Sequence, residues 1–225
     1  MASPRRDAQF KQVLDAADLV VPDGMPLVWL GRRHGHDMRR VYGPELLDTF
    51  CANTGNIYRH YFYGGAPGVA EAVAARMKRL YGVRTVGTWS PPYRPLSEDE
   101  KLEIECHIRD AKPDIVWVGL STPKQERWMY EFSSRLGVPV MAGVGAAFDF
   151  FAGTVKQAPP WMRENGLEWF FRLTHEPRRL WHRYILLGSE FAWNVALELL
   201  GVKRFDGRQE NLQTSHTHQD AQRAE

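Results

Sequence analysis

The sequence predicts an α/β protein: a Rossmann-like parallel sheet with helices on both faces, followed by a C-terminal helical appendage. Short apolar runs of strand length alternate with stretches of helical periodicity through the first 150 residues. From about residue 158 the sequence instead becomes rich in aromatic residues and arginine. Strands that alternate with helices of this length indicate a parallel sheet that is covered on both faces.

Taken in order, the apolar runs predict strands at residues 17–22, 58–63, 83–89, 114–120 and 138–144. Helical patterns lie between them at about residues 44–53, 67–81, 97–111 and 123–136. Ser97 and Glu100 form a capping box, in which each side chain bonds the backbone amide of the other residue. The acidic run that follows Ser97 is therefore interpreted as a helix start, in preference to a metal-binding cluster.

Length and composition restrict the class of protein. With 225 residues, 44% hydrophobic and 25% charged, the chain is long enough for one sizeable domain with a real core. A formal net charge of +2 does not favour bulk nucleic-acid binding. Cys51 and Cys106 lack any ligand spacing, which favours free thiols in a reducing compartment. The sequence shows no secretory signal and no membrane span, so a cytoplasmic protein is expected, with membrane contact from outside the bilayer left open.

The last third divides by composition. We expect a catalytic domain at residues 1–157, a helical appendage at 158–204 and a disordered tail at 205–225. Residues 161–193 hold four of the eight tryptophans, interleaved with arginines. Such a segment is either a core-packing helical hairpin with solvated arginines or an appendage at the membrane interface. Composition leaves both interpretations open.

Three predicted strands run into loops that are suited to phosphate or sugar, and ligands of open α/β sheets bind at the carboxyl ends of strands. The first loop, residues 63–68, is rich in glycine, and Pro67 is expected at the first position of the next helix. The amides of that helix start favour an anion, although a tight strand-to-helix turn explains the same residues equally well.

The second loop covers residues 119–126, where Gly119 ends a strand and Pro123 opens a helix. Lys124, Gln125 and Glu126 then fall in the first turn. A lysine is unfavourable at a helix N-terminus unless an anionic ligand lies there, which favours a binding role for this loop.

The third loop covers residues 143–150, in which small residues leave room for a ligand and Asp149 can accept hydrogen bonds from a ribose or a base. It lacks the third glycine of the dinucleotide fingerprint, so an oxidoreductase with a nicotinamide cofactor is disfavoured. Asp23 follows another predicted strand, and such a carboxylate can be a general base or a turn residue. No GxSxG, P-loop or HExxH motif occurs.

Several segments, taken in order, resemble the WecG/TagA/CpsF family of bacterial glycosyltransferases (glycosyltransferase family 26). The resemblance covers residues 5–200 and rests on these segments: Asp18-Leu19-Val20-Val21-Pro22-Asp23-Gly24, Arg40-Val41-Tyr42-Gly43, Gly64-Gly65-Ala66-Pro67-Gly68-Val69-Ala70, Pro123-Lys124-Gln125-Glu126, Gly143-Val144-Gly145-Ala146-Ala147-Phe148-Asp149, Ala158-Pro159-Pro160-Trp161-Met162, Gly166-Leu167-Glu168-Trp169 and Glu176-Pro177-Arg178-Arg179.

The resemblance implies an inverting enzyme that moves a sugar from a UDP-sugar to a polyprenyl-diphosphate-linked acceptor at the inner face of the plasma membrane. N-acetylmannosamine, its uronic acid, glucose or a similar sugar is implied, for cell-surface polysaccharide or teichoic-acid synthesis. No metal or other cofactor and no nucleic acid is expected, while homo-oligomerisation is left open. A base buried beside Gly24 is expected to bind protons more tightly than usual.

By the same resemblance the site residues receive roles. Asp23 is the candidate base, and Gln125 lines the reaction site. The implied donor-binding residues are Gly64, Gly65, Pro67, Gly119, Pro123, Lys124, Glu126, Gly143, Gly145, Ala147, Phe148 and Asp149. The implied acceptor-binding or membrane-binding residues are Arg40, Arg172, Arg178, Arg179 and Arg183.

The start of the sequence departs from the family pattern. Family members carry an earlier strand that ends in a threonine and an asparagine of the active site, whereas residues 5–14 read as the later part of the helix after that strand. The first strand is therefore expected to be missing. A misassigned start codon explains this, and the alternative is a truncated, non-catalytic paralogue that binds UDP-sugar or membrane.

Overall fold

The computed structural model describes residues 8–175 and residue 177. The chain divides into two compact units, residues 1–171 and residues 172–225. The sheet and all the loops singled out above belong to the first unit. Within the described residues, no helix combines the length and the apolar character that are needed to cross a bilayer.

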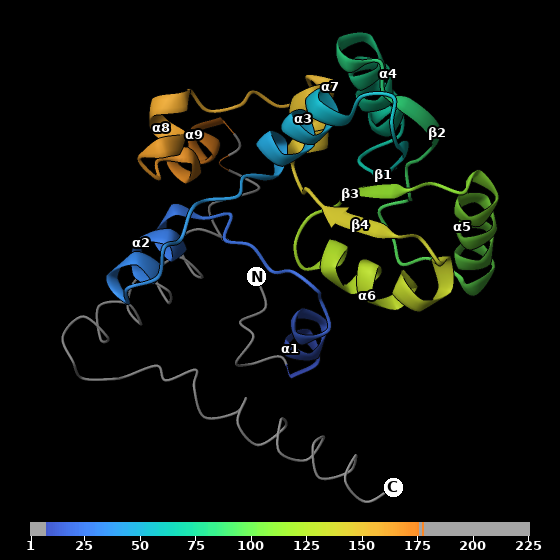
Figure 1. Ribbon diagram of the computed structural model, residues 1–225, viewed down its shortest axis with the longest axis horizontal. Coiled ribbons are helices and arrows are strands. Elements are labelled where there is room, and N and C mark those ends of the chain that lie inside the picture. Colours follow the sequence, from blue (N-terminus) through green and yellow to red (C-terminus); the bar gives the residue numbers. More distant parts are fainter. Residues whose placement is uncertain (1–7, 176, 178–225) are drawn as a thin grey trace, which may run out of the picture. The chain divides into compact units, whose positions relative to one another are not determined.

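A four-stranded, all-parallel sheet forms the centre of the first unit (Figure 1). Its strands are β1 (Arg59–Gly64), β2 (Arg84–Trp89), β3 (Ile115–Gly119) and β4 (Val140–Gly143), in the order β2-β1-β3-β4. These correspond to four of the five predicted strands. The sequence therefore predicted the α/β class and the direction of the strands correctly.

Helices cover both faces of this sheet, as predicted (Figure 1). The helices α3 (Gly43–Thr54), α4 (Val69–Tyr81) and α7 (Ala147–Ala152) pack with one face, and α5 (Glu98–Ala111) and α6 (Lys124–Leu136) pack with the other. Successive strand residues point to opposite faces, so Phe62 lies in the first core while its neighbours Tyr61 and Tyr63 lie in the second. Because helices cover both faces, the central strand β3 is apolar and buried at all five residues, whereas β1 begins with Arg59 and His60 and the edge strand β2 begins with Arg84.

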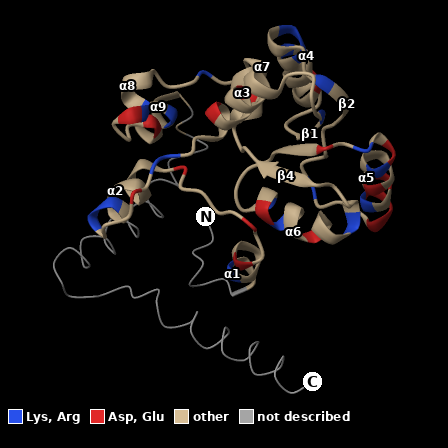
Figure 2. Cartoon of the chain, in the orientation of Figure 1, with Lys and Arg blue, Asp and Glu red and all other residues tan. Residues whose placement is uncertain are grey.

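The capping box at the start of α5 is confirmed. The Ser97 hydroxyl accepts a hydrogen bond from the Glu100 amide at 3.2 Å, and the Glu100 carboxylate accepts one from the Ser97 amide at 2.8 Å. Arg94 also holds Glu100, with Nη2–Oε1 at 2.6 Å, and this pairing lowers the pKa of Glu100 to about 2. The acidic residues visible at this end of α5 are thus part of a helix start (Figure 2).

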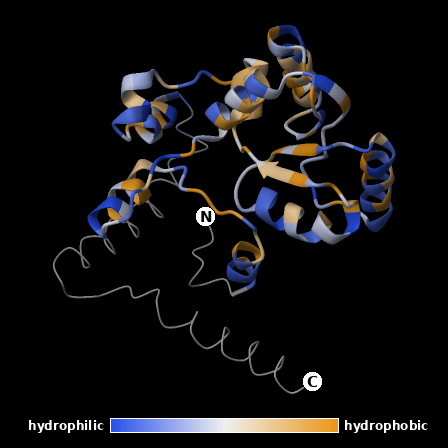
Figure 3. Ribbon diagram, in the orientation of Figure 1, coloured by the Kyte–Doolittle hydropathy of each residue, from blue (hydrophilic) through white to orange (hydrophobic). Residues whose placement is uncertain are grey.

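The strand predicted at residues 17–22 is wrong. After α1 (Ala8–Asp15), the chain runs without a strand to α2 (Met25–Arg33). Leu19 is 79% exposed and Val20 60%, and the connector is visibly hydrophobic in Figure 3. A strand requires a neighbouring strand for its backbone hydrogen bonds. Here the Ala17 amide instead bonds the Leu14 carbonyl at 3.2 Å, and the Pro22 carbonyl accepts from the Val41 amide at 2.9 Å. Apolar residues alone do not supply that ladder.

Two short helices follow the sheet: α8 (Pro160–Glu164) and α9 (Glu168–His175). Most of the predicted appendage at 158–204 and all of the predicted tail at 205–225 lie outside the described residues. The division at residues 157 and 204 therefore stays a prediction.

Candidate active site

The three predicted binding loops lie at one edge of the sheet. Gly64 at the end of β1 is opposite Gly119 at the end of β3, and Val118 is opposite Gly143 at the end of β4. The Gly65 amide also donates to the Gly119 carbonyl at 3.1 Å. The carboxyl ends of three strands thus meet, as the parallel order requires, and ligands bind at this edge in open α/β sheets.

Several glycines of these loops are required by internal packing. A Cβ atom on Gly64 would lie 2.5 Å from the Gly119 carbonyl oxygen, and one on Gly119 would lie 2.3 Å from the Phe148 ring. Gly68 differs, because its φ of +86° needs glycine while no atom lies within 4 Å of its missing Cβ. Tight packing thus accounts for Gly119, and packing together with a φ of +133° accounts for Gly64, whereas the open space lies at Gly68.

Pro67 does not open α4, which corrects the prediction from the sequence. The helix begins at Val69, and Gly68 precedes it in the left-handed conformation. Pro67 therefore lies in the turn between β1 and α4. If Pro67 were the first helical residue, the helix would begin directly after Ala66. Because Gly68 is left-handed, the helix can begin only after it.

Gln125 joins the second loop to the third. Its side chain is almost fully buried, at 8% exposure, and its Oε1 accepts a hydrogen bond from the Gly145 amide at 3.0 Å. Its Nε2 donates to Oε1 of Glu126 at 3.1 Å, and the same oxygen accepts from the Thr122 hydroxyl at 2.8 Å. Gly143 leaves space for this arrangement, because a Cβ there would lie 3.0 Å from Gln125 Nε2.

Lys124 is in the first turn of α6, as predicted, and it is exposed beside Pro123. A cation at this place opposes the helix dipole, and an anion bound at the same end of the helix compensates for it. The position of Lys124 is therefore suited to a diphosphate.

The third loop leads directly into α7. Ala147 and Phe148 are buried in the core at 0% and 1% exposure, so their side chains serve packing, and a ligand at these residues meets backbone. Asp149 is partly exposed in the first turn of the helix, and the Thr154 hydroxyl lies 3.4 Å from its Oδ1. Asp149 is the one of these three whose side chain is placed to meet a ligand.

Asp23 is exposed, with 70% of its side chain accessible, so the prediction of a buried base is wrong. The burial was inferred from a strand that does not form. Arg40 holds this residue instead: its Nε donates to the backbone carbonyl of Asp23, and its Nη2 lies 3.7 Å from Oδ1.

Arg40 connects three segments of the chain. Its guanidinium lies over the ring of Tyr42, 4.2 Å from the centroid, and donates to the Arg163 carbonyl at 3.2 Å. Its Nη2 forms an ion pair of 2.7 Å with Oε2 of Glu168. These contacts lie within the protein, and the predicted binding of acceptor by Arg40 stays a prediction.

Tyr42 and Gly43 extend this connection toward the loops. The Tyr42 hydroxyl donates to Oε1 of Glu168 at 3.1 Å, and burial raises the pKa of this hydroxyl. Gly43 packs so closely on the backbone of Val144 that a Cβ would lie 2.6 Å from the carbonyl oxygen. Asp23 is therefore tied, through Arg40 and the three residues after it, to the loop that holds Gly145.

Comparison with known proteins identifies the family. The profile of the "Glycosyl transferase WecG/TagA/CpsF family" matches residues 1–205. The chain belongs to this family. It is thus a glycosyltransferase of the hexosyltransferase type, and the family and enzyme class expected from the sequence are confirmed.

Two curated relatives carry the name N-acetylglucosaminyldiphosphoundecaprenol N-acetyl-beta-D-mannosaminyltransferase. The one from Bacillus subtilis (strain 168) is 29% identical over 202 residues, which cover 89% of this chain and 77% of that protein. The one from Bacillus spizizenii (strain W23) is 30% identical over 187 residues, which cover 82% of this chain and 69% of the relative. The relatives act, by their names, on a polyprenyl-diphosphate-linked sugar.

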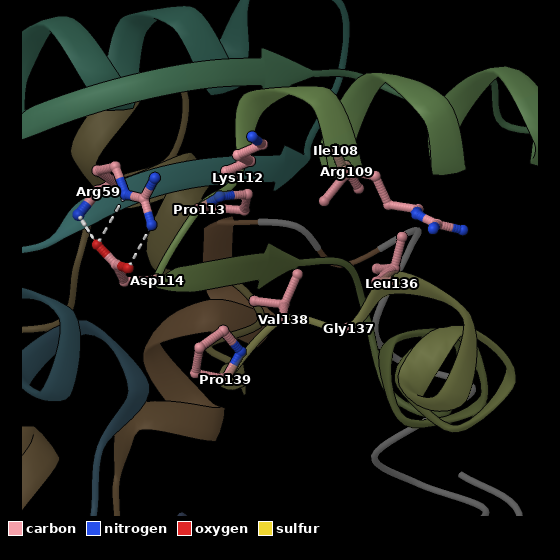
Figure 4. Close-up of a pocket in the computed structure, with 10 residues that line it drawn as sticks. All are labelled: Arg59, Ile108, Arg109, Lys112, Pro113, Asp114, Leu136, Gly137, Val138 and Pro139. Carbon is pink, nitrogen blue, oxygen red and sulfur yellow. Dashed lines mark hydrogen bonds and ion pairs between the residues drawn. The ribbon is translucent and has the colours of Figure 1, made fainter.

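A pocket of about 400 Å³ lies at the opposite edge of the sheet of this glycosyltransferase (Figure 4). Arg59 and Asp114, at the amino ends of β1 and β3, form part of its wall and pair through Arg59 Nη2 and Asp114 Oδ1 at 2.8 Å. The carboxyl ends of parallel strands are where ligands of such sheets bind. We therefore assign the candidate site to the three loops and not to this pocket.

The structure does not test the roles of the four other predicted arginines. Arg172 is in the last turn of α9 and belongs to the second compact unit. Arg178, Arg179 and Arg183 lie outside the described residues, so their roles stay predictions. Sequence reasoning gave Tyr42 and Glu168 no role, although both stand in the segments that carry the resemblance.

Proposed function

We propose that this glycosyltransferase moves a hexose from a UDP-sugar to a polyprenyl-diphosphate-linked acceptor, with inversion at the anomeric carbon. The observation that carries the proposal is the connection of an exposed carboxylate, Asp23, to the carboxyl edge of the sheet through Arg40 and Gly43. Together these features supply a base and a diphosphate site, which are what an inverting displacement requires.

The displacement takes place in one step. Asp23 takes the proton of the acceptor hydroxyl, whose oxygen attacks the anomeric carbon from the side opposite to UDP. The new carbon–oxygen bond forms while the bond to the β-phosphate oxygen breaks, and UDP leaves with that electron pair. The amides at the starts of α4 and α6 and the ammonium of Lys124 stabilise the developing negative charge on the diphosphate.

The names of the relatives suggest which substrates to test first. Both relatives are N-acetylmannosaminyltransferases that act on N-acetylglucosaminyl-diphosphoundecaprenol. UDP-N-acetylmannosamine is therefore the first donor, and the corresponding uronic acid and UDP-glucose are the next. An acetamido or carboxyl group is distinguished by a few polar contacts in the pocket, so donor screening decides between these sugars.

We propose that the reaction takes place at the surface of the cytoplasmic membrane, because the proposed acceptor is a membrane lipid. We also propose that four arginines contact phosphates of the acceptor or of lipid headgroups: Arg172, Arg178, Arg179 and Arg183. The guanidinium group binds phosphate well, and these arginines alternate with aromatic residues in the sequence. We also propose that transfer needs no metal ion. Turnover that is unchanged by a chelator supports this, and loss of turnover that added Mg²⁺ or Mn²⁺ restores contradicts it.

Release of UDP in the presence of donor and lipid-linked acceptor tests the assignment of the base. Asp23→Asn should lower kcat by roughly 10²- to 10⁴-fold, the usual contribution of a general base, and leave the donor KM nearly unchanged. Asp18→Asn, five residues earlier and also exposed, is the matched control and should retain turnover. Unchanged turnover in Asp23→Asn removes the base assignment. Donor binding without turnover for any sugar favours the non-catalytic alternative.

A further inference from the structure

We infer that Glu168 is a positioning residue for the base, acting on Asp23 through Arg40. The inference rests on the proposed function, because it takes Asp23 as the base. Glu168 is 128 residues from Arg40 in the sequence and is the first residue of α9. This helix follows the strands and loops of the sheet along the chain (Figure 1). Only the fold brings Glu168 next to the segment that holds Arg40.

The Glu168 carboxylate is engaged on both oxygens. Oε2 pairs with Nη2 of Arg40 at 2.7 Å, and Oε1 accepts from the Tyr42 hydroxyl at 3.1 Å. Gln157 Nε2 lies 3.2 Å from that hydroxyl and fixes it from the other side. A carboxylate held at both oxygens keeps its own position, and its charge-assisted bond therefore holds Nη2 of the guanidinium in place.

Water is largely excluded from this pair. The side chain of Arg40 is 17% exposed and that of Glu168 is 16% exposed, whereas Asp23 is 70% exposed. A shielded, short ion pair has a stronger preference for one geometry than a solvated pair does. The structure therefore holds Arg40 firmly on its Glu168 side and leaves the Asp23 carboxylate accessible to an acceptor.

Glu168 and Asp23 share one nitrogen of Arg40. Nη2 is 2.7 Å from Glu168 but 3.7 Å from Oδ1 of Asp23, and Nε donates to the backbone carbonyl of Asp23. Glu168 thus takes the close contact, and Arg40 orients Asp23 mainly through its backbone. Without Glu168 the guanidinium becomes free to pair closely with the Asp23 carboxylate, and a carboxylate paired with arginine accepts a proton less readily.

The same pairing holds the segment around Asp23 in place. The Val41 amide, next to Arg40, donates to the Pro22 carbonyl, next to Asp23, at 2.9 Å. Arg40 also donates to the Arg163 carbonyl at 3.2 Å, so the last turn of α8 participates. Loss of the Glu168 carboxylate therefore loosens the backbone of residues 22–24 in addition to changing the partner of Asp23.

Steady-state kinetics of Glu168→Gln in the full chain test the inference. We expect kcat to fall roughly 10- to 100-fold, the size of effect that a misplaced reacting group has, with the donor KM within about twofold of the wild type. Glu45→Gln is the matched control, since Glu45 pairs with Arg163 at 3.0 Å in the same cluster and is 65% exposed. That variant should turn over normally.

The double variant separates positioning from a general structural effect. If Glu168 acts through Asp23, Glu168→Gln causes little further loss of kcat in the Asp23→Asn background. If Glu168→Gln lowers kcat by the same factor in the Asp23→Asn background as in the wild type, the inference is contradicted. A rise in donor KM at constant kcat in Glu168→Gln also contradicts it. If Asp23→Asn loses turnover as expected while Glu168→Gln keeps full activity, the inference is overturned and the proposed function stands.

Hydrogen exchange gives a readout that does not depend on turnover. In Glu168→Gln the Val41 amide should exchange at least tenfold faster than in the wild type, because its carbonyl partner is held less firmly. In Glu45→Gln the rate should be unchanged. Equal protection of this amide in the wild type and Glu168→Gln overturns the inference even if no donor is ever turned over.

Discussion

The two edges of the sheet differ in how their residues are held. At the carboxyl edge the strands β1, β3 and β4 end in glycines, and one buried side chain, Gln125, joins the loops after β3 and β4. At the amino edge an ion pair between Arg59 and Asp114 stands at the wall of an open pocket (Figure 4). A pocket alone would have indicated the amino edge. The direction of the strands and the polar groups in the loops indicate the carboxyl edge.

The contrast also separates packing from chemistry. The amino edge is fixed by charges that are partly solvated, and such pairs contribute little to stability. The carboxyl edge is fixed by close approach of backbone and rings, where an added carbon atom has nowhere to go. Substitutions at the two edges should therefore differ strongly in their effect on stability and on turnover.

The largest effect is expected at Gly119. An added Cβ lies 2.3 to 2.6 Å from three ring atoms of Phe148, so Gly119→Ala should lower the free energy of unfolding by about 3 kcal/mol, at the upper end for overpacked cores. Denaturant unfolding measures this. Gly24→Ala is the control, because its Cβ has ordinary contacts at 3.8 Å and its φ of −89° suits alanine.

The clash itself can be isolated with a second substitution. Phe148→Leu makes room beside residue 119, so the double variant should be less destabilised than the sum of the two single variants. Additive losses would show that Gly119 is required for another reason than contact with Phe148. The comparison between edges would then lose its packing argument.

A smaller effect is expected at Gln125. Gln125→Leu keeps the approximate volume but leaves the Gly145 amide and the Glu126 carboxylate without this partner. A buried amide that loses its acceptor costs roughly 2 kcal/mol. We expect faster hydrogen exchange at the Gly145 amide and a higher KM for the donor, because the third loop is no longer tied to the second. Unchanged exchange at Gly145 would contradict the role of Gln125 as the link between the loops.

Local patterns predicted what depends on neighbours in the sequence. The four strands of the sheet, the helices between them and the capping box at Ser97 follow from hydrophobic periodicity and helix-start chemistry. The start of α2 also carries a signal in the sequence, because Pro26 lies in its first turn after the N-cap Gly24. Residues 17–22 show the limit, because their apolar run indicates a strand only where a partner strand is present.

Long-range contacts account for the rest of the site. The sequence and its resemblance singled out Asp23 and Gln125, but nothing in either reveals that Arg40 pairs with a residue 128 positions away. Nor does a pattern show that Phe148 occupies the space left by Gly119. Such contacts depend on how elements are placed in space, and a single sequence considered by itself carries no record of that placement.

The smallest effect is expected at the amino edge, from Asp114→Asn. Hydrogen bonds from the Arg59 side chain and amide lower the pKa of Asp114 to about 2, below its usual value of 3.8. The native state thus favours the carboxylate. Its contribution to stability is present above pH 3.8 and is lost as the pH falls through 3.8 toward 2.

Asp114→Asn should therefore be slightly less stable than the wild type at neutral pH, and the difference should shrink as the pH falls from 4 to 2. Thermal unfolding of both proteins across this range measures the effect. Release of UDP at neutral pH should be the same in both, because the amino edge takes no part in the transfer. A loss of turnover at equal stability would instead give the pocket in Figure 4 a role in the reaction, and the assignment of the site to one edge would fail.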